Sequence, residues 1–150
     1  MTDEQQIRSF VDAYYYHFLK LGKERPNGEI DEANLSAWSS LFTEDVLIED
    51  PAGTTFGTFR GRADFIAHAR QVLQQCKFVD VQVHRVITQP TEHRASILWT
   101  IKVEFGENPK IPADRRGRVI AVDGISNWVL NDENRAIRHT LVVFDHRTTA

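Results

Sequence analysis

Cysteine is nearly absent from this chain of 150 residues. Cys76 is the only one, so an internal disulfide cannot form and a cysteine-based zinc site is excluded. The six histidines show no spacing that is typical of metal ligands. We therefore expect no metal site and no cofactor, and a single reduced thiol fits a reducing compartment.

Long apolar runs and a strong excess of one charge are also missing. No apolar stretch approaches the roughly 20 residues of a membrane span, and the first residues, M-T-D-E-Q-Q, do not resemble a signal peptide. The formal net charge of -3 argues against general binding to nucleic acids or membrane surfaces. The one basic cluster, residues 115–118, is more simply a solvated loop. We expect a cytoplasmic protein without nucleic-acid or membrane partners.

Two common catalytic and nucleotide-binding motifs are absent as well. The stretch P-A-G-T-T-F-G lacks the Gly-Lys-Ser/Thr of a phosphate-binding loop. No G-x-S-x-G sequence is present, so the nucleophile elbow of the serine hydrolases is excluded. The chain therefore offers no nucleotide site and no serine nucleophile of these kinds.

The residues that are present fit one soluble globular domain. Hydrophobic residues make up 41% of the chain and charged residues 26%, which is an ordinary globular composition. A chain of this length can bury a sizeable core. There is no internal repeat or linker, so we interpret residues 1–150 as a single domain.

Helical periodicity dominates the first half of the chain. Thr2 and Gln5 have the spacing of a capping box at the start of a helix, and Gly22 is a reasonable end. The apolar stripe of this helix consists of Ile7, Val11, Tyr14, Phe18 and Leu21. A second helix is predicted from about Asp31 to Phe42. A third follows Gly61, with Phe65, Ile66, Ala69, Val72 and Leu73 facing inward.

Alternation with period two dominates the second half and predicts strands. Val79, Val81 and Val83 begin the first, and its pattern changes face after Val83, which indicates a bulge. Further strands are predicted at 95–105, 118–130 and 136–146, with a turn at 131–134. Short strands are also expected at 46–49 and 55–61. Because helices come first and long strands later, we predict an α+β fold with a mostly antiparallel sheet.

The loop at 106–116 contains two prolines and has no periodic pattern. It could flank the mouth of a pocket. A plain solvated connection is the simpler interpretation, because most loops are only that.

Asp50 ends the short strand at 46–49 and precedes Pro51. Pro51 cannot donate to a strand ladder and favours an extended conformation for Asp50. Asp is common in turns, so Asp50 could simply begin an ordinary turn over residues 50–53. The end of a strand beside a loop is also a position where scaffolds hold reactive groups.

Asp123 lies within the apolar strand R-V-I-A-V-D-G-I-S-N-W. A buried, isolated carboxylate there would cost several kcal/mol unless it were paired or protonated. Two alternatives remain open: Gly124 marks a bulge that turns Asp123 to water, or Arg138 pairs with it. If Asp123 is buried and unpaired, it should be neutral at pH 7, because burial raises a carboxyl pKa.

Tyr14 occupies a core position on the first helix, whereas Tyr15 and Tyr16 are expected to point elsewhere. A buried tyrosine hydroxyl normally finds a polar partner. On its own, this position is more simply explained by core packing.

The order of these features resembles the nuclear-transport-factor-2-like superfamily. Two helices are followed by L-F-x-x-D, E-D-P-x-G and G-x-x-x-F, and then by long strands. The closest resemblance is to the 3-oxosteroid isomerases, also called ketosteroid isomerases, and to the related SnoaL-like proteins. This resemblance implies a cone-shaped domain, in which a curved sheet is wrapped by three helices around an apolar pocket.

The resemblance also implies roles for three residues. Asp50 would be the general base, while Tyr14 and a protonated Asp123 would form an oxyanion hole. The five wall residues expected to bind a hydrophobic substrate are Phe18, Phe65, Trp99, Trp128 and Val142. Family members often support the first-helix tyrosine with a second tyrosine on the third helix, but Ala69 stands at that position here.

The implied activity is a cofactor-independent isomerisation. A proton next to a carbonyl would move within a steroid-like or polyketide-like substrate. The alternatives are a SnoaL-like cyclase or dehydratase that uses the same acids, and a non-catalytic binding or assembly module of the same fold.

A homodimer is also expected. The supposed outer face of the sheet combines Ser96, Thr100 and Ser126 with Leu98 and Trp128, more apolar area than a solvated sheet normally shows. Proteins that resemble this chain commonly pair through the sheet.

Overall fold

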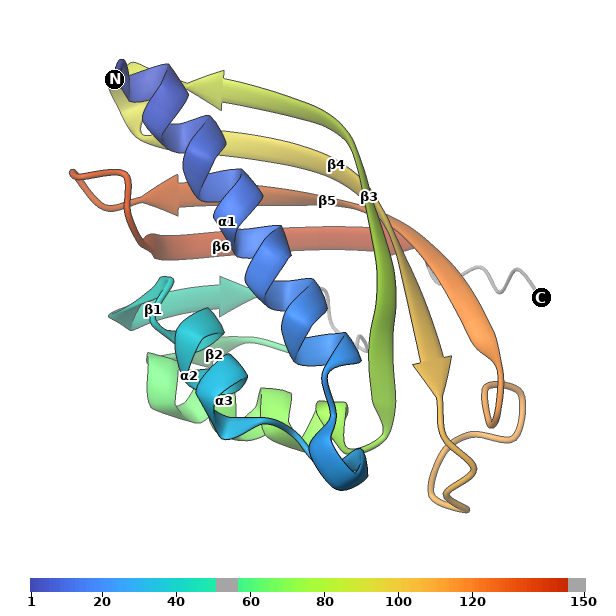
Figure 1. Ribbon diagram of the computed structural model, residues 1–150. Coiled ribbons are helices and arrows are strands. Elements are labelled where there is room, and N and C mark those ends of the chain that lie inside the picture. Colours follow the sequence, from blue (N-terminus) through green and yellow to red (C-terminus); the bar gives the residue numbers. More distant parts are fainter. Residues whose placement is uncertain (51–56, 146–150) are drawn as a thin grey trace.

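The computed structural model describes residues 1–50 and 57–145 (Figure 1). Within them, the helices are α1 (Asp3–Lys23), α2 (Glu32–Ser39) and α3 (Arg62–Leu73), with short 3-10 turns η1 (Pro26–Gly28) and η2 (Pro90–Glu92). The strands are β1 (Phe42–Glu49), β2 (Phe59–Arg60), β3 (Cys76–Gln89), β4 (Arg94–Phe105), β5 (Val119–Leu130) and β6 (Ile137–Asp145). The expected turn after Asp50, the first part of the strand at 55–61 and His146 lie outside the described residues.

The six strands form one sheet in the order β2-β1-β6-β5-β4-β3. Only β1 and β6 pair in parallel, and the other neighbours are antiparallel. The long strands β3, β4 and β5 bend strongly, and the three helices lie on the concave side of the sheet (Figure 1). The predicted α+β cone with a curved, mostly antiparallel sheet is confirmed.

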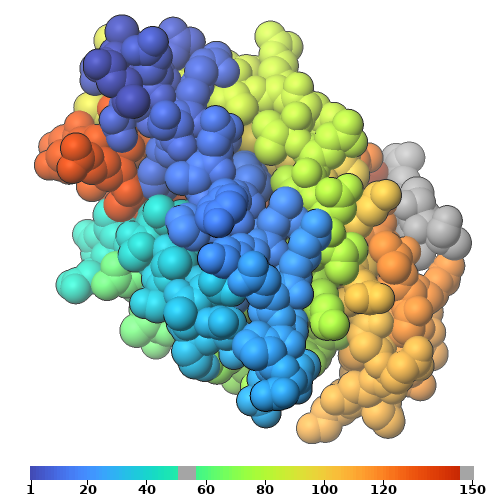
Figure 2. Space-filling view, viewed as in Figure 1, coloured from blue at the N-terminus to red at the C-terminus, as the bar shows by residue number. Residues whose placement is uncertain are grey.

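Helix α1 begins as predicted, with a reciprocal capping box between Thr2 and Gln5. It does not end at Gly22 but continues to Lys23. A Cβ atom at Gly22 would lie 2.3 Å from the carbonyl oxygen of Phe78. The glycine therefore allows β3 to approach the helix closely, and Figure 2 shows α1 packed along β3 on the visible face.

Helix α2 is shorter than predicted. Asp31 caps it by accepting hydrogen bonds from two backbone N–H groups, but the helix ends at Ser39. Phe42 instead begins β1 and pairs with Ile137, whose N–H donates to the carbonyl of Leu41 at 2.8 Å. Pairing with a strand from the other end of the chain thus sets this boundary.

The predicted bulge in β3 is confirmed. The pairing of β3 with β4 shifts between Val83 and Arg85, and a second shift lies between Phe78 and Asp80. Such shifts increase local twist and bend a strand, which accounts for the strong curvature of β3 (Figure 1). No helix within the described residues is long and apolar enough to cross a membrane.

The outer face of the sheet differs from the expected one. Ser126 and Trp128 point to the concave side and are buried. A different apolar row crosses the outer face, because Leu98 pairs with Ile125 and Ile125 with Val143. Ile125 is 40% exposed and Val143 is 51% exposed. The outer face is therefore apolar as expected and includes Leu98, but Ile125 and Val143 take the place of Trp128.

Candidate active site

A cavity of about 230 Å³ lies between the concave face of the sheet and the helices. Its walls are mostly apolar, and all three tryptophans of the chain, Trp38, Trp99 and Trp128, contribute to it. The five wall residues expected from the sequence also line it, namely Phe18, Phe65, Trp99, Trp128 and Val142. A largely apolar cavity with few polar groups is typical of a small-molecule site.

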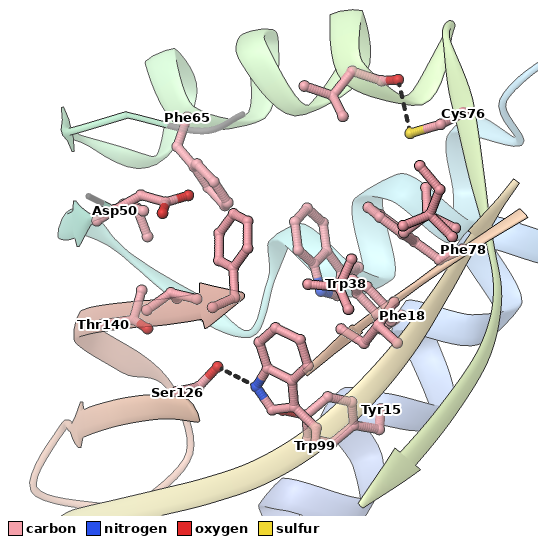
Figure 3. A pocket seen from close by; sticks show the side chains of 18 of the residues that line it. Tyr15, Phe18, Trp38, Asp50, Phe65, Cys76, Phe78, Trp99, Ser126 and Thr140 are labelled. Carbon is pink, nitrogen blue, oxygen red and sulfur yellow. Dashed lines mark hydrogen bonds between the residues drawn. The ribbon is translucent and has the colours of Figure 1, made fainter. Parts of the chain in front are cut away.

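Asp50 lines this cavity and is only 6% exposed. Strand β1 places it there: Glu49 pairs with Leu141 of β6, so Asp50 follows at the level of Val142. In Figure 3, Asp50 and Thr140 lie on the same side of the cavity. The strand end that the sequence singled out therefore delivers a carboxyl group to an apolar site, and its role as a base stays a prediction.

Tyr14 also lines the cavity, from helix α1. Burial raises the pKa of its hydroxyl well above the usual value of 10.0. The Trp38 indole N–H opposes this rise in pKa, although Nε1 forms no hydrogen bond of normal geometry within the described residues. Tyr14 is therefore a neutral hydroxyl donor at physiological pH, next to a buried indole N–H.

Tyr15 is a cavity residue that the sequence analysis missed. It is buried, and burial is the main cause that raises its pKa well above 10.0, while the Ser126 hydroxyl lowers it. Ser126 in turn accepts a hydrogen bond from Trp99 Nε1 at 2.9 Å. The helical spacing could have identified this residue, because Tyr15 comes four positions after Val11.

Asp123 does not reach the cavity, and its expected burial is wrong. It is exposed on the outer face, where Thr100 Oγ1 donates to its Oδ1 at 2.5 Å. His84 Nε2 lies 2.6 Å from the same Thr100 oxygen. Strand alternation explains the outcome, since Val122 and Ser126, at odd spacing from Asp123, line the cavity. The structure therefore brings Tyr14 and Asp50 to one cavity and leaves Asp123 outside.

Gly124 marks no bulge in the pairing of β4 with β5, which is continuous through Thr100 and Asp123. Its role is to make room for an indole ring. A Cβ at Gly124 would lie 2.4 Å from the ring of Trp99. The glycine thus lets Trp99 lie across β5 and reach Ser126.

The loop at 106–116 contributes to the cavity, so the simpler interpretation as a solvated connection is wrong. Pro112 and Arg115 line the cavity where it meets the surface, beside Gln75. Ile111 anchors the loop with only 1% of its surface exposed. Arg116 holds the loop's shape by donating to the Ile111 carbonyl at 2.8 Å.

Cys76 lines the cavity as a neutral thiol. Burial raises its pKa to about 11, although the Arg25 guanidinium acts in the opposite direction. Its Sγ donates to the Val72 carbonyl at 3.4 Å. Thiolate chemistry at neutral pH is therefore disfavoured here. Within the described part of the chain, no three His, Cys, Asp or Glu side chains lie close enough together to hold a metal ion.

The raised pKa of Cys76 predicts a loss of stability at alkaline pH. Between the ordinary value of 9.0 and about 11, the unfolded chain releases the thiol proton while the folded chain keeps it. The free energy of unfolding therefore falls as pH rises through this range, by about 3 kcal/mol from this group. Urea denaturation would measure the free energy of unfolding at pH 8 and at pH 11. The difference between these two free energies should be smaller in Cys76→Ala than in the wild type. An equal pH dependence in both proteins would contradict the assignment.

Comparisons with known proteins agree with this architecture. The profile of the SnoaL-like domain matches residues 27–139. A search of curated proteins finds no significant match.

Solved structures with a similar fold include three of different stated activity. A candidate polyketide cyclase from Xanthomonas campestris pv. campestris shares 15% identity at a TM-score of 0.71, covering 96% of this chain and 93% of that one. A candidate isomerase from Bacillus subtilis shares 13% identity at a TM-score of 0.71, and the match covers 97% of this chain and 90% of that one. An LEH-like epoxide hydrolase from M. tuberculosis shares 14% identity at a TM-score of 0.64, and the match covers 94% of this chain and 84% of that one.

These structural matches show the fold alone, since each identity is below 25%. The profile match is more specific, because it spans most of the chain and includes Asp50 and the strands β1 to β5. The protein has a nuclear-transport-factor-2-like fold and belongs to the SnoaL-like domain family.

Proposed function

We propose that this protein catalyses cofactor-independent proton transfer next to a carbonyl group of a hydrophobic substrate. The observation that carries the proposal is that Asp50, directly after β1, and Tyr14 of α1 line one apolar cavity. The similarity to a candidate isomerase and to candidate polyketide cyclases supports an enzyme of this family. In this proposal the reaction is an isomerisation, and the substrate is steroid-like or polyketide-like.

Asp50 is the base in this scheme. Its carboxylate accepts a proton from the carbon next to the carbonyl, and the electron pair of that C–H bond becomes part of an enolate. The enolate oxygen then carries the negative charge. In a substrate with a carbon–carbon double bond next to the carbon that lost its proton, the enolate extends over that double bond. Asp50 returns the proton to the far carbon of the double bond, which restores the carbonyl and leaves the carbon–carbon double bond conjugated with it.

Tyr14 is the hydrogen-bond donor to the enolate oxygen. Its raised pKa keeps the hydroxyl protonated, so it can donate throughout the physiological pH range. Trp38 partly offsets the effect of burial on the pKa of this hydroxyl. In this proposal it takes the supporting part that a third-helix tyrosine plays in proteins resembling this chain. Thr140 adds a buried hydroxyl on the Asp50 side, and its Oγ1 has no hydrogen-bond partner within the described residues.

A cyclase is the second candidate, and the similarity to candidate polyketide cyclases favours it. The first step would be the same: Asp50 removes the proton and Tyr14 stabilises the enolate. The enolate carbon would then attack a second carbonyl carbon of the same substrate molecule and close a ring, and Asp50 would give its proton to the new alkoxide oxygen. The two activities differ in the product, not in the first proton transfer.

Exchange of α-protons with deuterated solvent tests the first step directly. A panel of enolisable hydrophobic ketones would be incubated with the protein in D₂O and followed by proton NMR. We expect loss of the α-proton signal well above the buffer rate for at least one ketone class. Tight binding of ketones with exchange only at the buffer rate would contradict the proposal and favour a binding module.

We also propose a homodimer formed through the outer face of the sheet. The row of Leu98, Ile125 and Val143 presents apolar side chains to solvent across three strands. Light scattering at micromolar concentration should give twice the chain mass of 17.2 kDa. Val143→Asp should shift the mass towards one chain, whereas Tyr16→Asp on the exposed side of α1 should not. A wild-type mass of one chain would rule out the dimer.

A further inference from the structure

The cavity is elongated along strand β5. The residues of β5 that line it are Ile120, Val122, Ser126 and Trp128. The six positions from Ser126 to Ile120 correspond to about 20 Å along an extended strand, and less along a curved one. Asp50 lies at the Ser126 end, because it is level with Val142 and Val142 pairs with Ser126.

Tyr14 belongs to the same end of the cavity as Asp50. Its ring centroid lies 4.7 Å from that of Trp128, two positions beyond Ser126 on β5. The proposed reacting carbonyl therefore binds at this end. The walls between this end and the other are apolar and include Phe78, Val103 and Ile120.

Arg115 lines the opposite end, where the loop between β4 and β5 meets the start of β3. It is half-buried, and Gln75 and Pro112 flank it in the wall. Asp50 and Arg115 are the only lining residues among those described that carry a formal charge. The cavity thus has an acidic side chain near one end and a basic side chain at the other.

The side chains of the neighbouring arginines are engaged in the fold of the loop, but the side chain of Arg115 is not. Arg116 donates to the carbonyls of Pro109 and Ile111, and Arg118 donates to the carbonyl of Asp114. The Arg115 side chain forms no ion pair and no hydrogen bond within residues 1–50 and 57–145. A half-buried guanidinium that the loop does not use is available to a ligand in the cavity.

We propose that Arg115 binds the carboxylate of an elongated substrate whose reacting carbonyl lies at the Asp50 end. This inference rests on the proposed function, because that function places the carbonyl. A guanidinium holds a carboxylate through two parallel hydrogen bonds. The wall offers one guanidinium and one carboxamide, Gln75, which suits a singly charged carboxylate better than a phosphate with its greater charge and larger number of acceptors.

The charge distribution also sets the orientation of such a substrate. A carboxylate near Asp50 would be repelled, whereas one at Arg115 is attracted. The apolar middle of the cavity holds the hydrocarbon body. Among hydrophobic ketones, the structure therefore selects oxo acids over neutral steroids of similar size.

Binding of dodecanoate and dodecan-1-ol tests this inference without any reaction. Both probes have the same hydrocarbon chain and differ in the charged end. The fluorescence of the three tryptophans, all in the cavity wall, reports binding. We expect the wild type to bind dodecanoate roughly tenfold more tightly than the alcohol, as for a hydrogen bond to a charged group.

Arg115→Met should remove this preference while leaving the affinity for the alcohol nearly unchanged. Arg115→Lys should keep part of it, because the charge remains but the two-pronged geometry is lost. Lys110→Met is the matched control: it removes one positive charge from the same loop at an exposed position that does not line the cavity. Circular dichroism would verify that each variant is folded.

A wild type without preference for dodecanoate would overturn the inference, as would a folded Arg115→Met variant that retains the preference. These outcomes are distinct from failure of the proposed function. Exchange of neutral ketones without Arg115-dependent binding would remove only the carboxylate site. Arg115-dependent binding without exchange of any ketone would remove only the proposed chemistry.

Discussion

Asp50→Asn should reduce the rate of α-proton exchange by about 10²- to 10⁴-fold, the range that general acid-base catalysis contributes. The carboxamide has the same shape as the carboxylate but cannot accept the substrate proton. Because Asp50 follows the last residue of β1 and contributes no strand pair, the fold should persist. The measurement is NMR exchange in D₂O with the ketone that the wild type processes best.

Asp45→Asn provides a matched control, since Asp45 is an exposed carboxylate on the same strand. Its exchange rate should equal that of the wild type. Ligand binding by Asp50→Asn, followed through tryptophan fluorescence, should also persist. Full exchange by a folded Asp50→Asn variant would remove Asp50 from the mechanism.

Tyr14→Phe should lower the same exchange rate by roughly 10²- to 10³-fold, as expected for loss of one donor to a developing oxyanion. The donor matters more in the transition state than in the bound ketone, because negative charge builds on the oxygen during proton transfer. The loss should therefore appear mainly in kcat, with KM little changed. Steady-state kinetics on an isomerised ketone separates the two constants.

Two neighbouring tyrosines serve as controls for Tyr14. Tyr16 is 61% exposed, so Tyr16→Phe should have no effect on kcat. Tyr15→Phe removes the contact with Ser126 and should lower kcat less than Tyr14→Phe does, because Tyr15 shapes the cavity wall and does not bind the enolate oxygen. If Tyr14→Phe retained the wild-type kcat, another group would have to stabilise the enolate.

Local sequence patterns predicted those helices and strands that are shaped by contacts close in sequence, and those strands that bury only one face. The alternation in β4 predicted its inward face, because Ser96 and Thr100 contrast with Ile97 and Trp99. The face change after Val83 predicted a real bulge. Asp50 was predicted to lie at a strand end, and its position at the cavity follows from the parallel pairing of β1 with β6.

The orientation of Asp123 could not be obtained from the same alternation. Both faces of β5 carry apolar residues, for example Val122 on one and Ile125 on the other. The decisive contact is non-local: the ring of Trp99 needs the space that Gly124 leaves, which fixes Gly124 inward and Asp123 outward. A resemblance that depended on motif position placed the acid on the wrong face.

Helix and loop boundaries depended on long-range contacts in a similar way. Gly22 has the appearance of a helix end, but it serves close packing against Phe78. Phe42 fits the helical stripe, but pairing with Ile137 draws it into a strand. Arg115 belongs to a basic cluster whose members cannot be told apart from the sequence. The fold of the loop gives them different roles, because Arg116 donates to the Ile111 carbonyl whereas Arg115 lines the cavity.

We propose that Tyr14 and Asp50 act on one carbonyl group in one cavity, and a structure of the complex with 2-naphthol would show this geometry. The aromatic ring and oxygen of this phenol resemble an enolate. We expect the naphthol oxygen about 2.7 Å from the Tyr14 hydroxyl, with the ring beside the Asp50 carboxylate and against Trp128. A naphthol bound outside the cavity, or inside it with its oxygen turned away from Tyr14, would contradict the claim.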